Sequence, residues 1–483
     1  MMLGRKQLLI NGEWRDASDG KTQPVINPAT EEVIAEVASA TSEDVDAAVR
    51  AARAAFEGPW GKMSARERGR LVYKLGEQLM AQADEVARLE TLHNGKPITE
   101  SRHVEIPAAA ECLQYFAGWA DKIHGETVPV KGGQLVYTLR EPVGVVAAIV
   151  PWNFPLLIAV WKVAPALAMG NTVILKPASQ TPLTALALGE MATDLGFPPG
   201  VLNVITGSGS TAGQAIVDHP GIDKIAFTGD TSTGKGIMKS AADTLKHITL
   251  ELGGKSPNIV FADADLDAAV RGATMGIFYG KGEVCAAGSR LLVESSVKDE
   301  FLSKIADRTK KMVAGDPLNP KTRLGAISSK AQLERVLRYV EIAKQEGATL
   351  LAGGERTDIG TGKGYFMQPT VFGNVTVDMT IAREEVFGPV LSAIEFADVE
   401  DAISKANASI YGLASGVWTR DVRKAHYVAS KLKAGTVWIN TYNTYDTAAA
   451  FGGYKQSGFG REMSVHALDY YTQLKTVWVD MAP

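Results

Sequence analysis

The sequence has little cysteine. Its 483 residues include only two cysteines, Cys112 and Cys285, far apart in the chain. Two thiols can build neither a disulfide framework nor a clustered zinc site, so each must be considered by itself. Such sparse use of cysteine favours a reducing compartment, and we expect a cytoplasmic protein.

A surplus of charge is also missing, because 50 basic side chains stand against 54 acidic ones, a formal net charge of −4. This balance indicates neither a nucleic-acid surface nor a polybasic membrane anchor, so we expect no nucleic-acid partner and no membrane partner. The seven histidines show no metal-ligand spacing, and no metal site is predicted.

Long apolar segments are rare. The N-terminal sixteen residues contain only Leu8-Leu9-Ile10 as an apolar run, too short for a signal peptide. Residues 142–161 carry no charge, but they include Pro142, Pro151, Asn153 and Pro155. Because proline inside a helix removes a backbone hydrogen bond and clashes with the preceding turn, this segment predicts a buried strand that ends in a tight turn, not a membrane span.

Apolar material is sufficient for a sizeable core, with 46% hydrophobic residues, and the length suggests two large domains or about three of average size. Short β-rich runs alternate with alanine-rich helical patterns, which indicates an α/β fold with largely parallel sheets. We expect helices over 42–56, 64–92 and 329–346, and strands over 144–150, 172–176, 201–206, 224–228 and 247–252.

Two α/β series follow each other along the chain. Residues 143–254 read as a nucleotide-binding unit, and a second series runs from 258 to about 453. Segments 122–141 and 463–483 are richer in β-branched and aromatic residues, and we expect them to form strands outside both cores.

Two glycine patterns follow predicted strands. Gly207-x-Gly209-x-x-Ala212 fits a dinucleotide-binding spacing, and Gly229-x-x-x-x-Gly234 has a looser one. Either could place backbone N–H groups and a helix N-terminus against phosphates. Either could equally be a plain strand-to-helix turn, in which glycine supplies a positive φ.

Cys285 and Glu251 are candidates for chemistry. Cys285 lies in a segment of small residues after an apolar stretch, although a cysteine is often only a buried hydrophobe. Glu251 ends an alternating strand before Gly253-Gly254, where a carboxylate can be a general base or a solvated acid. Cys112 falls in the helical pattern 106–119 and is expected in the core.

A series of short motifs extends from residue 151 to residue 462. They are Pro151-Trp-Asn-Phe-Pro155, Lys176-Pro-Ala-Ser179, Phe227-Thr-Gly-Asp-Thr231, Leu250-Glu-Leu-Gly-Gly254, Gly282-Glu-Val-Cys285, Glu384-Glu-Val-Phe-Gly-Pro389, Phe451-Gly-Gly-Tyr-Lys-Gln-Ser-Gly458 and Gly460-Arg-Glu462. In this order and spacing the sequence resembles the NAD(P)-dependent aldehyde dehydrogenase superfamily over nearly its whole length. Within that superfamily, the sequence is most similar to the hydrolytic branch that acts on general aldehydes.

The resemblance implies a fold and a domain division. It implies a Rossmann-like cofactor-binding domain over 1–121 and 142–254 and an α/β catalytic domain over 255–453. A β oligomerisation arm is implied over 122–141 and 463–483. These segments would exchange between protomers of a homo-oligomer, a tetramer or dimer, and leave unpaired strand edges in a monomer.

The resemblance also implies the catalytic residues. Cys285 matches the nucleophile that attacks the aldehyde carbon, and Glu251 matches the base that assists it and later activates water to hydrolyse a thioester. A base is needed because a free thiol, with a pKa of about 8.5, is mostly protonated at neutral pH. Asn153 matches the amide donor to the developing oxyanion, typically worth roughly 3 kcal/mol. Glu462 matches a second acid that can replace or relay protons with that base.

For the cofactor, the resemblance moves the phosphate-facing role from the Gly207 loop to the Gly229–Gly234 loop. Lys176 matches a lysine on the adenosine ribose, and Glu385 matches a carboxylate on the nicotinamide ribose. The other implied cofactor-binding residues are Val150, Trp152, Ser179, Gly209, Gly229, Gly234, Leu252 and Phe387. Since Ser179 stands where a glutamate is frequent in NAD-preferring members, we expect NADP or NAD to be accepted.

Other departures from the family pattern lie beside the site. Asp230 stands where a serine is common, and a carboxylate beside a diphosphate should turn away. Lys281 and Glu283 replace uncharged residues near the thiol, where they could pair or shift its acidity.

The aldehyde tunnel of the family corresponds to Phe154, Leu157, Trp161 and Tyr445, which favour medium-chain or aromatic aldehydes. Two rival functions remain open at this point: acylating chemistry with a thiol acceptor, and a non-catalytic protein that keeps the fold. The presence of Glu251 argues against the first, and the presence of Cys285, Glu251 and Asn153 together argues against the second.

Overall fold

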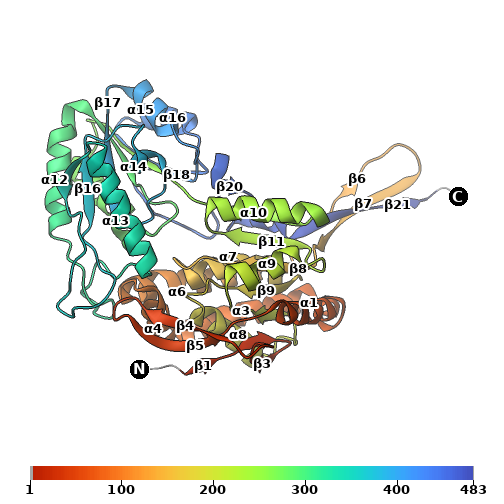
Figure 1. Ribbon diagram of the computed structural model, residues 1–483. Helices are drawn as coiled ribbons and strands as arrows, with labels where there is room; N and C mark the ends of the chain where they lie inside the picture. Colours follow the sequence, from red (N-terminus) through yellow and green to blue (C-terminus); the bar gives the residue numbers. More distant parts are fainter. Residues whose placement is uncertain (1–3, 482–483) are drawn as a thin grey trace.

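The computed structural model describes residues 4–481, which form two α/β lobes and a β-sheet that projects from them (Figure 1). Residues 1–3 of the expected cofactor-binding domain and residues 482–483 of the expected C-terminal segment lie outside the described residues. Mixed helices and sheets confirm the α/β class. The domain boundaries remain a prediction.

The first lobe is built on an eight-stranded sheet in the order β20-β12-β11-β8-β9-β10-β2-β3. Its five central strands, from β12 to β10, are parallel, and the strands at both ends are antiparallel. The strands are β2 (Leu8–Ile10), β3 (Glu13–Arg15), β8 (Val145–Ile149), β9 (Thr172–Lys176), β10 (Leu202–Val204), β11 (Lys224–Thr228), β12 (His247–Glu251) and β20 (Gly458–Phe459).

Helices cover both faces of this sheet, which explains why its central strands β8, β9, β10 and β11 are buried along their whole length. In β8, Val146 and Ala148 pack with one set of helices, whereas Val145, Ala147 and Ile149 pack with the other. The first set is α3 (Ala65–Ala81), α4 (Ala83–Asn94), α6 (Ile106–Trp119), α7 (Pro155–Ala168) and α8 (Leu183–Asp194). The second is α1 (Ser42–Glu57), α9 (Gln214–Asp218) and α10 (Thr231–Ala241).

The second lobe is built on a seven-stranded sheet in the order β15-β16-β17-β14-β13-β18-β19, in which only β15 is antiparallel to its neighbour. Its strands are β13 (Pro257–Val260), β14 (Arg290–Glu294), β15 (Thr349–Ala352), β16 (Thr370–Gly373), β17 (Val390–Phe396), β18 (Ala414–Trp418) and β19 (Thr436–Ile439). The helices are α11 (Leu266–Phe278) and α12 (Lys298–Lys310) on one face, and α13 (Lys330–Gln345), α15 (Val399–Asn407) and α16 (Val422–Lys431) on the other.

Shorter elements complete the body. A three-stranded sheet contains β1 (Arg5–Lys6), β4 (Thr22–Asn27) and β5 (Glu32–Ala38), and the short helices are α2 (Pro59–Lys62), α5 (Ile98–Glu100) and α14 (Thr380–Arg383). None of the helices within residues 4–481 combines the length and apolar character needed to cross a membrane.

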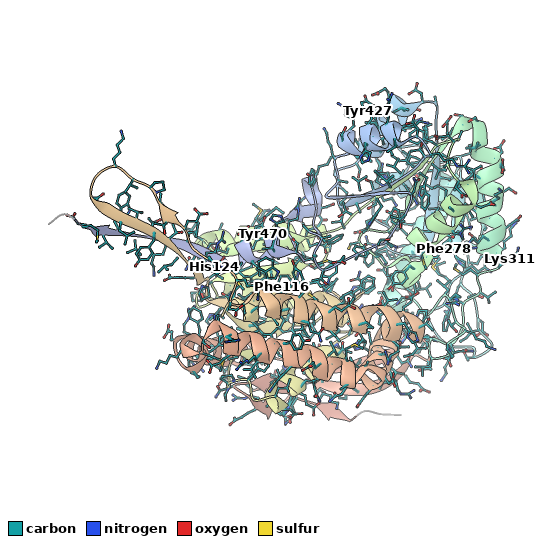
Figure 2. The ribbon with its side chains drawn as sticks, turned by 180° about the vertical axis from the view of Figure 1, so that it is seen from behind. Phe116, His124, Phe278, Lys311, Tyr427 and Tyr470 are labelled. Atoms are coloured by element: carbon teal, nitrogen blue, oxygen red, sulfur yellow. The ribbon has the colours of Figure 1, made fainter. Side chains whose placement is uncertain are left out.

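The arm is an antiparallel sheet of β6 (Thr127–Val128), β7 (Gln134–Pro142) and β21 (Thr472–Asp480). It extends away from both lobes in Figure 1, and from behind, His124 and Tyr470 lie where it joins the body (Figure 2). β21 pairs with β7 of the same chain from Thr472 to Asp480, so the exchange between protomers implied above would involve the outer edges of this sheet.

Three sequence expectations need correction. The helix expected over 64–92 is two helices, because Gln82 leaves the helical conformation (φ −104°, ψ 18°) without any glycine or proline to announce it. The strand and turn expected over 142–161 end at residue 154, since Pro155 begins α7, where its missing N–H costs nothing. The C-terminal arm begins at Thr472, because Ala467, Leu468 and Tyr471 are buried in the first lobe.

Candidate functional site

The candidate site lies at the carboxyl ends of the parallel strands of the first lobe, where the second lobe covers them. Parallel α/β sheets bind ligands at this edge. One pocket there is lined by Pro151, Trp152, Asn153, Thr228, Gly229, Asp230, Leu252, Gly253, Cys285, Gln332, Arg335, Glu385 and Phe387. The pocket therefore joins the expected nucleophile, the expected oxyanion donor and much of the expected cofactor site.

Cys285 follows a tight loop after α11. Gly280, Lys281 and Gly282 all have left-handed φ values of 56°, 63° and 71°. Gly282 is required there, because a Cβ at this position would lie 2.2 Å from the carbonyl oxygen of Gly388. Burial, with the negative charges of Glu251 and Glu385, holds the pKa of the Cys285 thiol well above its usual range. The resting group is a thiol, so a base must assist it.

Glu251 ends β12 and is only 3% exposed, so the alternative of a solvated strand-end acid is wrong. Neither carboxylate oxygen has a well-formed hydrogen bond within residues 4–481. Burial raises the pKa of Glu251 to about 8, while the Lys162 ammonium acts in the opposite direction and Cys285 interacts with the same carboxylate. A buried, unpaired carboxyl group beside a thiol is chemically able to exchange a proton with it.

Asn153 is buried beside the nucleophile loop. Its Nδ2 donates a hydrogen bond of 2.9 Å to the backbone oxygen of Glu283, two residues before Cys285. Its own backbone oxygen accepts a bond of 2.8 Å from Lys96 Nζ. The amide is therefore held at the loop, and it carries a second N–H that this bond does not use.

Glu462 lies behind Glu251 and not at the thiol. Its Oε1 forms an ion pair of 2.5 Å with Nζ of Lys162 from α7, and its Oε2 has no partner among the described residues. Both Lys162 and Glu462 change the pKa of Glu251, the first downward and the second upward. The sequence did not single out Lys162, which occurs in an apolar helix pattern without a motif.

The Gly229–Gly234 loop opens α10, whose N-terminus faces the pocket. Asp230 caps this helix, because its Oδ1 accepts bonds from the backbone N–H groups of Ser232 and Thr233. Although burial opposes them, these bonds hold the pKa of Asp230 below its ordinary value. A Cβ at Gly234 would lie 2.5 Å from Leu252 Cδ2, so glycine allows the helix to approach that residue.

Glu385 and Phe387 enter the pocket from the second lobe. Glu385 Oε1 accepts a bond of 2.9 Å from Gly254 N, and burial raises its pKa to about 7. Phe387 meets Trp152 edge to face, with 5.3 Å between ring centroids.

The sequence did not reveal two further pocket residues, Gln332 and Arg335, which donate to the backbone oxygens of Phe387 and Glu385. Their spacing of three residues on the predicted helix was the available signal.

Lys176, Ser179 and Gly209 form a separate part of the same edge. Lys176 Nζ donates to the backbone oxygens of Gly207 and Pro177, and burial lowers its pKa to about 8. Ser179 is partly exposed and accepts a bond from Gln23 through its backbone oxygen. Gly209 begins a π-helical turn, Gly209–Gly213, and Val150 donates its N–H to the Lys176 oxygen.

Three of the four expected tunnel residues belong to aromatic contacts, and the fourth, Leu157, does not. Trp161 and Tyr445 both contact Phe451, with centroids 5.6 and 5.7 Å apart, and Phe154 stacks on Tyr279. Leu157 packs against the core of the first lobe, and Tyr445 is 41% exposed.

Within residues 4–481 no group of three or more histidine, cysteine, aspartate or glutamate side chains could hold a metal ion.

Lys281 and Glu283 pair with each other, one of the two alternatives left open by the sequence. Lys281 Nζ lies 2.9 Å from Glu283 Oε2, and both side chains are buried. Because Lys281 also donates hydrogen bonds to Asn94, the pair connects the loop of Cys285 to the end of α4.

Comparison with known proteins identifies relatives over nearly the whole chain. The model of the aldehyde dehydrogenase family matches residues 14–477. The chain is 49% identical over 476 residues to the mitochondrial aldehyde dehydrogenase of Homo sapiens, covering 98% of this chain and 92% of that protein. It is 50% identical over 479 residues to aldehyde dehydrogenase 1A1 of Mesocricetus auratus, covering 99% and 95%.

Solved structures of related enzymes have the same fold as this chain. The NAD+ complex of an aldehyde dehydrogenase from Bacillus cereus has a TM-score of 0.97 and 51% identity, covering 99% of this chain and 97% of that one. An indole-3-acetaldehyde dehydrogenase in complex with NAD+ has a TM-score of 0.97 and 45% identity, with the same coverage. These matches confirm the Rossmann-like and catalytic α/β architecture.

The environment of Cys285 predicts a pH profile for its alkylation by iodoacetamide. Because the pKa of the thiol is raised, the rate should still be climbing at pH 9, by about tenfold per pH unit. Glu385→Gln removes a negative neighbour and should move the profile to lower pH. Mass spectrometry of the labelled peptide separates Cys285 from buried Cys112, which should stay unmodified. A plateau below pH 8 would show instead a resting thiolate.

Proposed function

This chain belongs to the aldehyde dehydrogenase family, and on that premise we propose that it oxidises an aldehyde to the carboxylic acid by a hydrolytic route through Cys285. Membership makes it an NAD-dependent oxidoreductase that acts on aldehydes. The observation that carries the proposed route is the buried carboxyl group of Glu251 beside a thiol of raised pKa.

In the first step, the sulfur of Cys285 attacks the aldehyde carbon while Glu251 takes the thiol proton. The free N–H of Asn153 and the backbone N–H of Cys285 donate to the oxygen that becomes negative. Removing one such donor typically costs roughly 3 kcal/mol in the barrier. Since the Asn153 amide is already held by the Glu283 oxygen, little entropy is lost when it binds the oxyanion.

The pocket fits a dinucleotide on its own geometry. Glycine at positions 229 and 234 lets the start of α10 pack closely against Phe227 and Leu252 at the pocket wall. The Glu385 carboxyl group accepts a bond from Gly254 in the same pocket, and Trp152 and Phe387 offer aromatic surface. When bound, NAD+ supplies the acceptor for the hydride that leaves the tetrahedral adduct, so that a thioester remains on Cys285. Asp230 occupies the first N–H groups of α10, which supports its exclusion from the ligand set.

Hydrolysis completes the cycle. After the hydride has left, Glu251 releases the proton that it took from the thiol to solvent and is a base again. It then removes a proton from the water that attacks the thioester and passes it to the departing sulfur, so that Cys285 leaves as the thiol. Lys162 and Glu462 both act on the Glu251 carboxyl group, and the Oε2 of Glu462, which has no hydrogen-bond partner among residues 4–481, supports its role as the second acid. Acylating chemistry must keep water inactive, and a buried base at the thiol is unsuited to that, so the hydrolytic route is preferred.

The substrate is proposed to be a medium-chain or aromatic aldehyde. Aromatic rings gather beside the site at Phe154, Trp161 and Tyr445, and they offer no charged partner to a polar substrate. The relative whose name is indole-3-acetaldehyde dehydrogenase supports an aromatic choice.

NADP is proposed as an alternative cofactor, because Ser179 brings no negative charge to the edge where the adenosine ribose is expected. Lys176 is three residues away and could face a 2′-phosphate. Its ammonium group now donates to two backbone carbonyls, and its pKa is lowered to about 8. A phosphate would restore its full charge, with a net gain of roughly 1–2 kcal/mol after desolvation.

A homo-oligomer is proposed from the arm. Its strands expose Leu135, Leu139, Leu474 and Trp478, and the outer edges of β21 and β6 are unpaired within the described chain. An isolated sheet with apolar faces and open edges is a surface for self-association.

Replacement of Cys285 by serine should abolish aldehyde oxidation, since a hydroxyl is a far poorer nucleophile than a thiol. NADH formation measured at 340 nm with NAD and an aldehyde should fall at least a thousandfold, and no added thiol acceptor should be needed by the wild type. Cys112→Ala is the matched control and should keep normal turnover. Retention of more than a tenth of the activity by the serine variant would disprove the nucleophile assignment.

Replacement of Ser179 by glutamate should lower kcat/KM for NADP by at least tenfold more than for NAD, because the new carboxylate repels the 2′-phosphate. Ser179→Gln adds similar bulk without charge and should change both cofactors alike. Equal losses in the glutamate variant, or a wild type that ignores NADP, would show that Ser179 does not set the choice.

Light scattering at micromolar concentration should give a mass that is a multiple of 51.5 kDa. The double variant Leu474→Lys with Trp478→Lys places charges on the exposed arm and should shift the mass toward one chain. A monomeric wild type would contradict the proposed role of the arm.

A further inference from the structure

We infer that Lys281 is a positioning residue for the reaction, which acts by holding the Asn153 amide and the Cys285 loop in one frame. The inference rests on the proposed function, in which Asn153 donates to the oxyanion. It concerns a residue that differs from the uncharged one common in the family at this place.

A closed ring of contacts passes through both catalytic segments. Lys281 Nζ donates to the side-chain and backbone oxygens of Asn94, at 2.7 and 2.8 Å. Asn94 Nδ2 donates 2.7 Å to the backbone oxygen of Trp152, the neighbour of Asn153. Asn153 Nδ2 then donates to the Glu283 backbone oxygen, and Glu283 Oε2 returns to Lys281 Nζ at 2.9 Å.

Other buried groups support the ring from outside. Glu283 Oε1 accepts a bond of 3.0 Å from Ser328 N, and Lys96 Nζ donates to the Asn153 oxygen while it pairs with Glu105. Gly280 N bonds to Glu100 Oε2 at 3.2 Å at the start of the loop. The ring is therefore anchored to α4, to the segment before α13, to the buried Lys96–Glu105 pair and, through Gly280, to Glu100 at the end of α5.

The position of Lys281 is costly for a residue with no other task. Its side chain is 1% exposed, and its backbone has a left-handed φ of 63°, which a side chain other than glycine rarely adopts. A buried ion pair seldom adds to stability compared with apolar residues of the same shape. Lys281 is strained and buried, and its partner Glu283 lies two residues before the nucleophile. We therefore explain the presence of this lysine by its effect on the geometry of the site and not by a gain in stability.

The route of action is mechanical. Without the ammonium, Asn94 loses the donor that fixes its carbonyl and amide oxygens, and the Trp152–Asn153 peptide loses a fixed partner. The Asn153 amide then samples orientations in which its free N–H no longer faces the oxyanion. Because a donor must lie at hydrogen-bonding range of the charge that develops, kcat should suffer while cofactor binding does not.

The test compares Lys281→Met, Glu283→Gln and the double variant in the full chain. Lys281→Met should lower kcat at least tenfold, with KM for NAD and the Kd for NADH within about twofold of wild type. It should also lower the melting temperature, since Glu283 becomes a buried unpaired charge. Adding Glu283→Gln removes that charge and should restore the melting temperature, but kcat should stay low because the contact to Asn94 is still missing.

A double-mutant cycle with Asn153→Ala tests whether Lys281 acts through the amide. In the Asn153→Ala background, Lys281→Met should change kcat by less than about twofold, because the group that it positions is absent. Arg53→Met removes an ion pair with Asp223 far from the site and is the control for lost stability; it should lower the melting temperature without changing kcat at 25 °C.

Three results would overturn the inference: a kcat that recovers together with the melting temperature in the double variant, multiplicative losses in the Asn153→Ala background, or an unchanged kcat in Lys281→Met. Each requires an active wild type. If the wild type itself reduces no cofactor with any of about a dozen aldehydes, the proposed function fails instead, and the two failures are distinguishable.

Discussion

The site depends on the removal of one carboxyl group from water. Glu251 ends β12 under the second lobe, where it is 3% exposed and has no well-formed hydrogen bond among the described residues. Burial raises the pKa of Glu251 to about 8 against the opposing effects of Lys162 and Cys285, so the carboxyl group can hold or accept a proton near physiological pH. Burial and the charge of Glu251 keep the Cys285 thiol protonated. The ionised form of Glu251, which becomes abundant near pH 8, is the one that can take the thiol proton.

The two lobes are arranged to create this pairing. Asn153 and Gly229 of the first lobe line one pocket together with Cys285 and Glu385 of the second lobe. Glu251 ends β12 of the first lobe and interacts with Cys285 there. Two buried ion pairs lie near the catalytic groups, Lys162 with Glu462 near the base and Lys281 with Glu283 near the nucleophile. Such pairs usually add little to the stability of the fold. They fix charges and amides in place, which is what a reaction that develops an oxyanion requires.

Much of the parallel sheet could be predicted from the sequence, since β8, β9, β11 and β12 are short apolar runs between helical patterns. The break between α3 and α4 could not be predicted, because no glycine or proline marks it at Gln82. The nucleophile and base were accessible only through motif order: by itself, Glu251 was as consistent with a solvated acid. Lys162 and the Gln332–Arg335 face were missed because their functions depend on which side of a helix meets the other lobe. The pairing of Lys281 with Glu283 was an open alternative that only the loop geometry decides.

Glu251 is proposed to activate the water that hydrolyses a thioester on Cys285. Rapid mixing of the Glu251→Gln variant with NAD and an aldehyde at pH 9, where some thiolate is present, tests this role most directly. We expect a burst of about one NADH per active site followed by a stalled steady state, while acid-quenched protein carries the acyl group on Cys285. A linear steady rate close to that of the wild type, with no acylated Cys285, would contradict the assignment of Glu251 as the hydrolytic base.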